Sequence, residues 1–110
     1  MGPLTPAVFH VLLALSGGER HGYGILKEVL RQTGGEVRLG PGTLYGTLQR
    51  LMDASLVEEC EGPGEREDER RRYYRLTRSG RQALQMEARR MEILVRAARA
   101  QHIIPRSSRG

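Results

Sequence analysis

Two short segments carry the side chains best suited to binding a polyanion. The first, Arg71-Arg72-Tyr73-Tyr74-Arg75-Leu76-Thr77, is basic and aromatic and runs directly into a helix cap. The second, Gly42-Thr43-Leu44-Tyr45, opens a short amphipathic helix with small and hydroxylated residues. Guanidinium groups donate hydrogen bonds to phosphates and guanine edges, and hydroxyl groups fix a protein in register on a phosphate backbone. A helix followed by a basic hairpin indicates a winged helix-turn-helix that reads DNA.

The helix expected from Pro41 onward has one apolar and one polar face. Its apolar side chains fall at i, i+4, i+7 and i+8 from Leu44, which is the spacing of a single buried face. The opposite face holds Gly42, Thr43, Gly46, Gln49, Arg50 and Asp53, with Tyr45 at the boundary. That face lacks long apolar side chains, and its small residues would let the backbone approach another surface closely.

The polar face of this helix predicts contacts with DNA. Gln49 and Arg50 suit base edges or phosphates, and the major groove admits one helix. The Thr43 and Tyr45 hydroxyls would hold the phosphate backbone, and the N–H groups at Gly42 and its neighbour face a phosphate from the helix N-terminus. We expect all five residues to bind DNA; the alternative for Tyr45 is packing in the core at the foot of the helix.

The elements that must position these side chains follow from caps and turn signals. Thr5-Pro6 starts a first helix, which Ser16-Gly17-Gly18 ends. A second helix starts near Gly22, with His21 interpreted as a cap or a buried hydrogen-bonding group, and it ends at residues 33–35. These two helices, together with the one from Pro41, predict the helical part of the DNA-binding unit.

A hairpin completes the unit and forms the wing. One strand begins at Leu56-Val57, residues 62–69 form a polar turn, and residues 71–76 return as the second strand. The sequence therefore predicts a mainly α fold with a small β-hairpin: a winged helix-turn-helix over residues 1–78.

Charge is segregated along the wing. Residues 58–69 carry seven acidic side chains and one arginine, whereas residues 70–81 carry six arginines and no acid. We predict that Arg70, Arg71 and Arg72 contact phosphates or the minor groove, while the acidic tip points away from the DNA. In the alternative arrangement, the two blocks pair across the hairpin and leave a solvated face.

The last helix is expected to start at the Thr77 cap and to run to about His102. Apolar side chains recur along it at spacings of four and three, which makes a heptad-like seam. The seam and its flank comprise Leu84, Ala88, Met91, Leu94, Val95 and Ala98. Because the seam lies beyond the winged unit, we expect a second copy of the chain to cover it, with packing against the first helix as the alternative. Residues 79–102 would then be a dimerisation helix and residues 103–110 a flexible tail.

Composition agrees with a DNA-binding protein. The chain has 110 residues, which favours one domain, a net charge of +5 and a pI of about 10.1. Only Lys27 among the basic residues is not an arginine, a bias that genomic base composition explains equally well. The single cysteine, Cys60, permits no intrachain disulfide and favours a cytoplasmic protein; it either fills a strand or senses redox state. The apolar run Phe9 to Leu15 is too short to span a bilayer.

Enzymatic functions find no support in the motifs. His10, His21 and His102 share no metal-ligand spacing with each other or with Cys60. The chain has no glycine-rich phosphate loop of the required pattern and no recognisable nucleophile motif. We therefore expect no catalytic residue, no metal site and no cofactor.

Several motifs in order resemble the PadR family of bacterial transcriptional regulators. They are His21-Gly22-Tyr23-Gly24-Ile25, Gly42-Thr43-Leu44-Tyr45, Leu48-x-Arg50-Leu51, Arg72-Tyr73-Tyr74-x-Leu76-Thr77 and Gly80. The chain is similar to the short subtype, in which one C-terminal helix follows the wing and mediates dimerisation. The resemblance implies a homodimeric repressor that binds an inverted-repeat operator and is released by a phenolic acid, a drug-like aromatic or another stress signal. The last helix has no aromatic residue, which departs from family members whose ligands stack at the dimer interface.

Two other functions remain open on the sequence alone. A winged helix can serve as a protein-interaction module, and the acidic wing tip would suit that role. The basic charge could also support nonspecific association with nucleic acid, without preference for a site.

Overall fold

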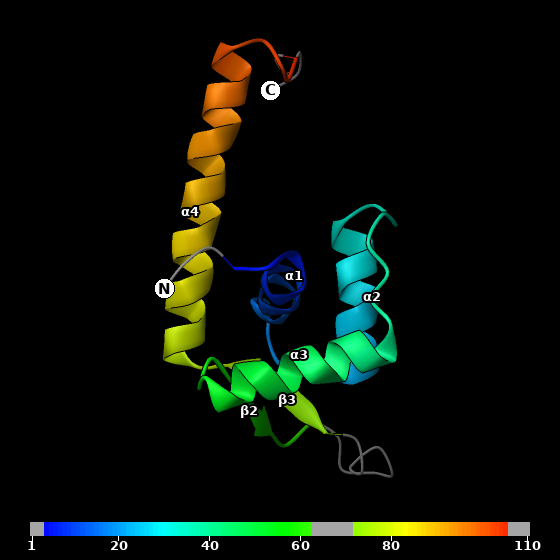
Figure 1. Ribbon diagram of the computed structural model, residues 1–110. Helices are drawn as coiled ribbons and strands as arrows, with labels where there is room; N and C mark the ends of the chain where they lie inside the picture. The colour runs from blue at the N-terminus through cyan, green and yellow to red at the C-terminus, as the bar shows by residue number, and fades with distance from the viewer. Residues whose placement is uncertain (1–3, 63–71, 106–110) are drawn as a thin grey trace.

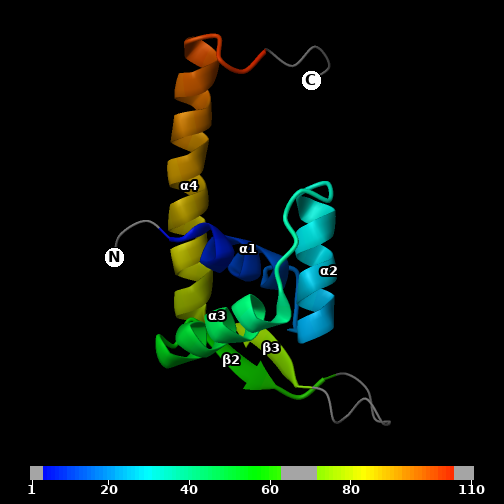
Figure 2. The same cartoon turned by 45° about the vertical axis from the view of Figure 1, so that its right-hand side comes forward.

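In the described part of the chain, a small sheet and three short helices form the body, and a long fourth helix extends from it (Figure 1). The computed structural model describes residues 4–62 and 72–105. Its elements are α1 (Pro6–Leu15), β1 (Arg20–His21), α2 (Gly22–Gln32), α3 (Pro41–Asp53), β2 (Val57–Cys60), β3 (Tyr73–Leu76) and α4 (Arg78–Ala100). The radius of gyration is 15.8 Å, above the about 13 Å of a compact chain of this length. The excess reflects α4, which reaches beyond the other helices in both views (Figure 2).

Side-chain caps start three of the four helices in the described part of the chain. The Thr5 hydroxyl accepts a hydrogen bond from the Val8 N–H at 3.3 Å, and the Thr77 hydroxyl accepts one from the Gly80 N–H at 3.0 Å. His21 accepts one through Nδ1 from the Gly24 N–H at 3.0 Å, so its interpretation as a cap is confirmed. Each bond satisfies an N–H group that has no partner within its helix.

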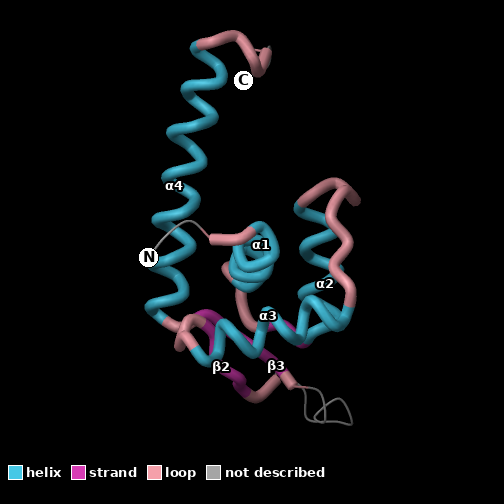
Figure 3. The backbone as a smooth tube through the Cα atoms, viewed as in Figure 1, coloured by secondary structure: helices cyan, strands magenta, loops and turns pink. Residues whose placement is uncertain are grey.

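Within the described residues, the sheet has three strands in the order β1-β3-β2, and both pairs of neighbouring strands are antiparallel. The magenta segments labelled β2 and β3 lie side by side in Figure 3. The expected hairpin is present, with Val57 opposite Leu76 and Cys60 opposite Tyr73. A third strand that the sequence did not indicate, β1, extends this hairpin, with His21 opposite Tyr73. Two residues are too few to show a strand periodicity, so this edge strand left no signal in the sequence. The expected wing tip falls on residues 63–71, outside the described residues.

The core surrounds α1, which contacts each of the other three helices. Its buried apolar side chains are Val11, Leu12, Ala14, Leu15, Ile25, Val29, Leu44, Leu48, Leu51, Leu56, Val57, Tyr74 and Leu84. The apolar face predicted for α3 is confirmed for its three leucines, whereas Met52 is half-buried at the edge of the core.

Thr47 is fully buried among these side chains, and its hydroxyl has no hydrogen-bond partner among the described residues. A buried polar group without a partner is destabilising by its cost of desolvation. We therefore expect Thr47→Val, which keeps the shape, to raise the free energy of unfolding by about 1 kcal/mol. Urea unfolding followed by circular dichroism would measure the change. A loss of stability would mean that the hydroxyl is hydrogen-bonded in solution.

Two hydrogen bonds join the start of α4 to the turn that follows α3. The Thr77 N–H donates to the Leu56 carbonyl at 3.1 Å, and the Thr77 hydroxyl donates to the Ser55 carbonyl at 2.7 Å. Ser55 turns the chain from α3 into β2 with a φ of 62°. Gly80 lies so close to Leu56 that an added Cβ would overlap the Leu56 carbonyl oxygen. We call these four residues the α3–α4 joint.

Candidate nucleic-acid interface

The residues predicted to read DNA on α3 share one exposed surface. Gly42, Thr43, Tyr45, Gln49 and Arg50 are all exposed. The Gln49 amide donates to the Asp53 carboxylate at 3.1 Å, which orients the amide along the outside of the helix. The outer face of α3 is therefore free of contacts with the core and carries hydrogen-bonding groups.

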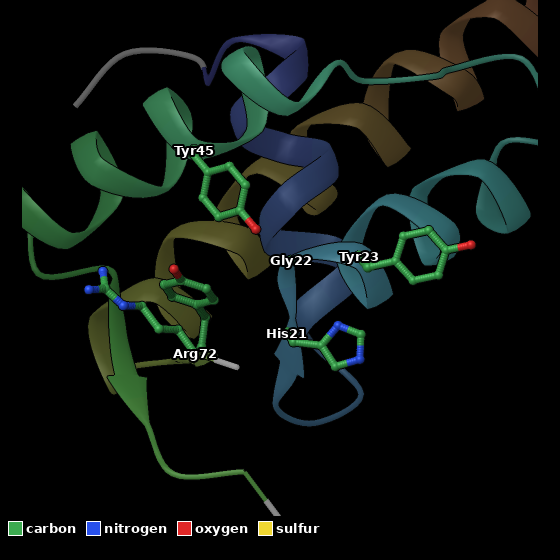
Figure 4. A pocket seen from close by; sticks show the side chains of 6 residues that line it. His21, Gly22, Tyr23, Tyr45 and Arg72 are labelled. Carbon is green, nitrogen blue, oxygen red and sulfur yellow. The ribbon is translucent and has the colours of Figure 1, made fainter. Parts of the chain in front are cut away.

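Tyr45 links α3 to the start of α2. Its side chain is 51% exposed, so it does not pack in the core as the alternative held. Its hydroxyl points to Gly22, where an added Cβ would overlap that oxygen (Figure 4). Gly22 is thus required for the position of Tyr45, which explains one glycine of the motif at residues 21–25.

Among the described residues, two ion pairs join the acidic and the basic charge blocks of the hairpin. Arg72 Nη1 lies 3.4 Å from Glu59 Oε2, and Arg75 Nε lies 2.8 Å from Glu58 Oε2. These two pairs match the alternative prediction, in which the acidic and basic blocks pair across the hairpin. Arg72 remains well exposed despite its partner. Arg70 and Arg71, the other expected phosphate contacts, lie outside the described residues.

An aromatic cluster lies beside the wing, and it was not predicted from the sequence. The His21 ring meets the Tyr73 ring edge-on at a centroid distance of 5.2 Å and is stacked parallel with the Tyr23 ring at 6.4 Å. Lys27 Nζ lies 5.3 Å from the centre of the exposed Tyr23 ring. The only signal was the motif at residues 21–25, whose aromatic residues flank a helix start.

A cleft of about 360 Å³ opens where α2, α3 and β3 meet (Figure 4). Its walls are His21, Gly22, Tyr23, Tyr45, Arg72 and Tyr74. Burial raises the pKa of Tyr74, and the nearby Glu59 carboxylate acts in the same direction. Tyr74 therefore keeps its proton at neutral pH and can act as a hydrogen-bond donor.

The expected dimerisation seam divides between two environments. Leu84 is buried in the core of its own subunit, because the first turns of α4 pack against α1. Leu94 is 65% exposed, and Met91 and Val95 are more than a third exposed. Ala88 is exposed and Ala98 is half-buried, while His102 lies past the end of the helix with a φ of 63°. Of the expected tail, residues 106–110 lie outside the described residues.

Other kinds of site find no support in the described part of the chain. Residues 4–62 and 72–105 contain no cluster of His, Cys, Asp or Glu that could hold a metal ion. Over the same residues, no helix combines the length and the apolar character needed to cross a bilayer. Burial raises the pKa of the Cys60 thiol, which lowers its reactivity at neutral pH.

The family described as the transcriptional regulator PadR-like family matches residues 11–86, from the core of α1 to the first turns of α4. The chain belongs to the PadR-like family of transcriptional regulators. PadR-like proteins bind DNA and are not enzymes. Within the described residues of this PadR-like chain, α4 follows the wing.

Two curated relatives extend this assignment. The PadR-like chain is 40% identical over 88 residues to transcriptional regulator Rv3488 of Mycobacterium tuberculosis, which covers 79% of the chain and 77% of the relative. It is 45% identical over 78 residues to an uncharacterised 37.1 kDa transposon protein of Streptomyces fradiae. That match covers 71% of the chain but 21% of the transposon protein, so the chain spans about a fifth of that relative.

Solved structures share the fold. A PadR family regulator from Clostridium difficile superimposes with a TM-score of 0.75 at 23% identity, over 87% of this chain and 97% of that one. Bacillus subtilis PadR, solved in complex with operator DNA, gives a TM-score of 0.59 at 24% identity over 76% of this chain and 46% of its own.

Proposed function

We propose that the protein is a homodimeric repressor that binds an inverted-repeat operator through α3 and the wing. The observation that carries this proposal is the exposed polar face of α3, whose Tyr45 lines the same cleft as Arg72 of the wing. Bacillus subtilis PadR, which shares the fold, has been solved with operator DNA. The operator contact would take place in the cytoplasm.

The contacts proposed for α3 follow from its geometry. A helix fits the major groove, where Gln49 and Arg50 would meet base edges or phosphates. Thr43 and Tyr45 would hold phosphates through their hydroxyls, and Gly42 would bring the helix N-terminus close to the backbone. Arg72, with Arg70 and Arg71 before it, would hold the DNA from the wing.

The proposed dimer forms through α4. Its Met91, Leu94 and Val95 side chains are exposed on one side of a helix that extends past the body of the chain (Figure 1). Ala88 and Ala98 continue the same side, and their small size allows two helices to approach closely. Residues 1–78 would thus be the DNA-binding unit, residues 79–102 the dimerisation helix and residues 103–110 a flexible tail.

Release by a small molecule or stress signal completes the proposal. Within α4 no aromatic side chain is available for a planar ligand to stack on. A ligand would therefore act by changing the angle between the two winged units rather than by stacking between the α4 helices.

Substitutions on α3 test the proposed docking helix. We expect Arg50→Ala and Tyr45→Ala each to weaken binding to a DNA duplex taken from upstream of the gene by about tenfold, because each removes a base or phosphate contact. Fluorescence anisotropy on a labelled duplex from upstream of the gene would measure this, against an unrelated duplex of equal length. Arg31→Ala is the matched control, since Arg31 is an exposed arginine on α2 that already pairs with Glu28 at 2.6 Å.

Thermal unfolding of both variants would exclude loss of the fold as the cause. Unchanged binding in the two α3 variants would rule out α3 as the docking helix. Equal binding of the wild-type protein to both duplexes would rule out preference for the upstream site.

A further inference from the structure

The cleft at the junction of α2, α3 and β3 has the chemistry of an anion site. Tyr45 and Tyr74 contribute hydroxyls, Arg72 contributes a positive charge, and none of the six described residues that line the cleft is acidic. The start of α2 also lines the cleft through Gly22 and Tyr23, and the positive end of its dipole favours an anion there.

The position of the cleft points to DNA as the source of that anion. Tyr45 belongs both to the cleft and to the exposed surface of α3 that the proposed function docks into the major groove. That groove is about 12 Å wide and is bordered by phosphate backbones. A duplex held on α3 would therefore bring a phosphate to the cleft at one side of the helix.

An acidic side chain stands beside this site. Glu59 Oε2 lies 3.4 Å from Arg72 Nη1, and Glu59 is opposite Tyr74 in the sheet register. Residues 58 and 75 point to the other face of the sheet, because side chains alternate along a strand. Glu58 and Arg75 thus form a matched ion pair that does not line the cleft.

We infer that the cleft takes one backbone phosphate of the DNA and that Glu59 competes with this phosphate for Arg72. In the free protein Glu59 holds the guanidinium at the cleft, and binding exchanges the carboxylate for the phosphate. Glu59 consequently weakens DNA binding while it keeps Arg72 in place. The inference rests on the proposed function, because α3 must bring the phosphate to the cleft.

Four single variants of the full chain test the exchange. Glu59→Gln should tighten binding to a duplex about fivefold, because it removes one repulsion at close range. Arg72→Gln should weaken binding and lower the slope of log affinity against log salt by about 0.9 per subunit, the loss of one phosphate contact. Glu58→Gln and Arg75→Gln make the same charge changes on the other face of the sheet and should each alter affinity less than twofold.

Two duplexes separate this inference from the proposed function. One is selected by the wild-type protein from random sequence, and the other is a random duplex of equal length. Phosphate contacts persist in nonspecific binding, so the four variants remain informative even if no sequence is preferred. If no sequence is preferred, the proposed function fails, but the effect of the four variants on binding to the random duplex still tests whether the cleft holds a phosphate.

The inference is overturned if Glu59→Gln changes DNA affinity no more than Glu58→Gln does. It is equally overturned if Arg72→Gln changes the affinity and its salt dependence no more than Arg75→Gln does. It is also overturned if the wild-type protein binds neither duplex. Saturable binding of benzoate to the wild-type protein that is lost in Tyr45→Phe, while Tyr45→Phe leaves DNA affinity unchanged, would assign the cleft to a small anion instead.

Discussion

Replacement of Gly80 by alanine is expected to lower the free energy of unfolding by about 3 kcal/mol, at the upper end of overpacking effects. The added Cβ would overlap the Leu56 carbonyl oxygen, which is backbone and cannot rotate away. That carbonyl also accepts the Thr77 N–H, so a shift of Leu56 would disturb the capped start of α4. Chemical unfolding followed by circular dichroism would give the difference from wild type.

Gly46→Ala is the matched control for this change. Gly46 lies within α3 on the exposed side, and an added Cβ there would meet no atom of the described residues within 4 Å. Alanine has the higher helix propensity, so this variant should gain up to about 1 kcal/mol. Equal stability of the two variants would show that the α3–α4 joint is looser in solution than the contact between Gly80 and Leu56 indicates.

Introduction of a charge at Leu94 is expected to separate the proposed dimer and to weaken operator binding by at least about a hundredfold. Leu94 is 65% exposed on α4 and is not part of the buried core of its own subunit, so Leu94→Glu should leave the subunit folded. In a dimer, the same substitution would bury an unpaired carboxylate at the seam. The loss of affinity follows because two linked half-site contacts gain about 10²–10⁴ in avidity over one.

Sedimentation velocity would show whether the Leu94→Glu protein is a monomer or a dimer. Fluorescence anisotropy would measure its affinity for the duplex that the wild-type protein prefers. Gln85→Glu serves as the control, because it adds the same charge to an exposed residue of α4 outside the seam. A Leu94→Glu particle of two chains with wild-type affinity would exclude this seam as the interface.

Most of the helices could be predicted from the sequence, because their caps and apolar faces depend on residues that are close together in the chain. The Thr5 and Thr77 caps and the His21 cap depend on a side chain and an N–H three residues away, so short segments predict them. The buried leucines of α3 follow from helical periodicity in the same way. Spacing predicts which face of a helix is apolar, but it does not identify the partner. For that reason the spacing predicts an intersubunit position for Leu84, although this side chain packs within its own subunit.

Features that join distant segments escaped prediction. The two-residue strand β1 pairs with β3 more than fifty positions later, and nothing in its own sequence signals that pairing. The cleft brings together Gly22, Tyr45 and Arg72, each of which has a separate local explanation. Only the fold makes these residues neighbours, so the candidate phosphate site could be recognised in the structure and not in the sequence.

The α3–α4 joint has a consequence for how such regulators diversify. Because Thr77 at the start of α4 is hydrogen-bonded to Ser55 and Leu56 in the turn that follows α3, the distance between the two recognition helices of a dimer would be set by how the α4 helices cross. Base preference, in contrast, would reside in the outer face of α3. Substitutions in α4 would therefore change the spacing of the half-sites, and substitutions in α3 would change the bases that are recognised. The two properties could evolve independently.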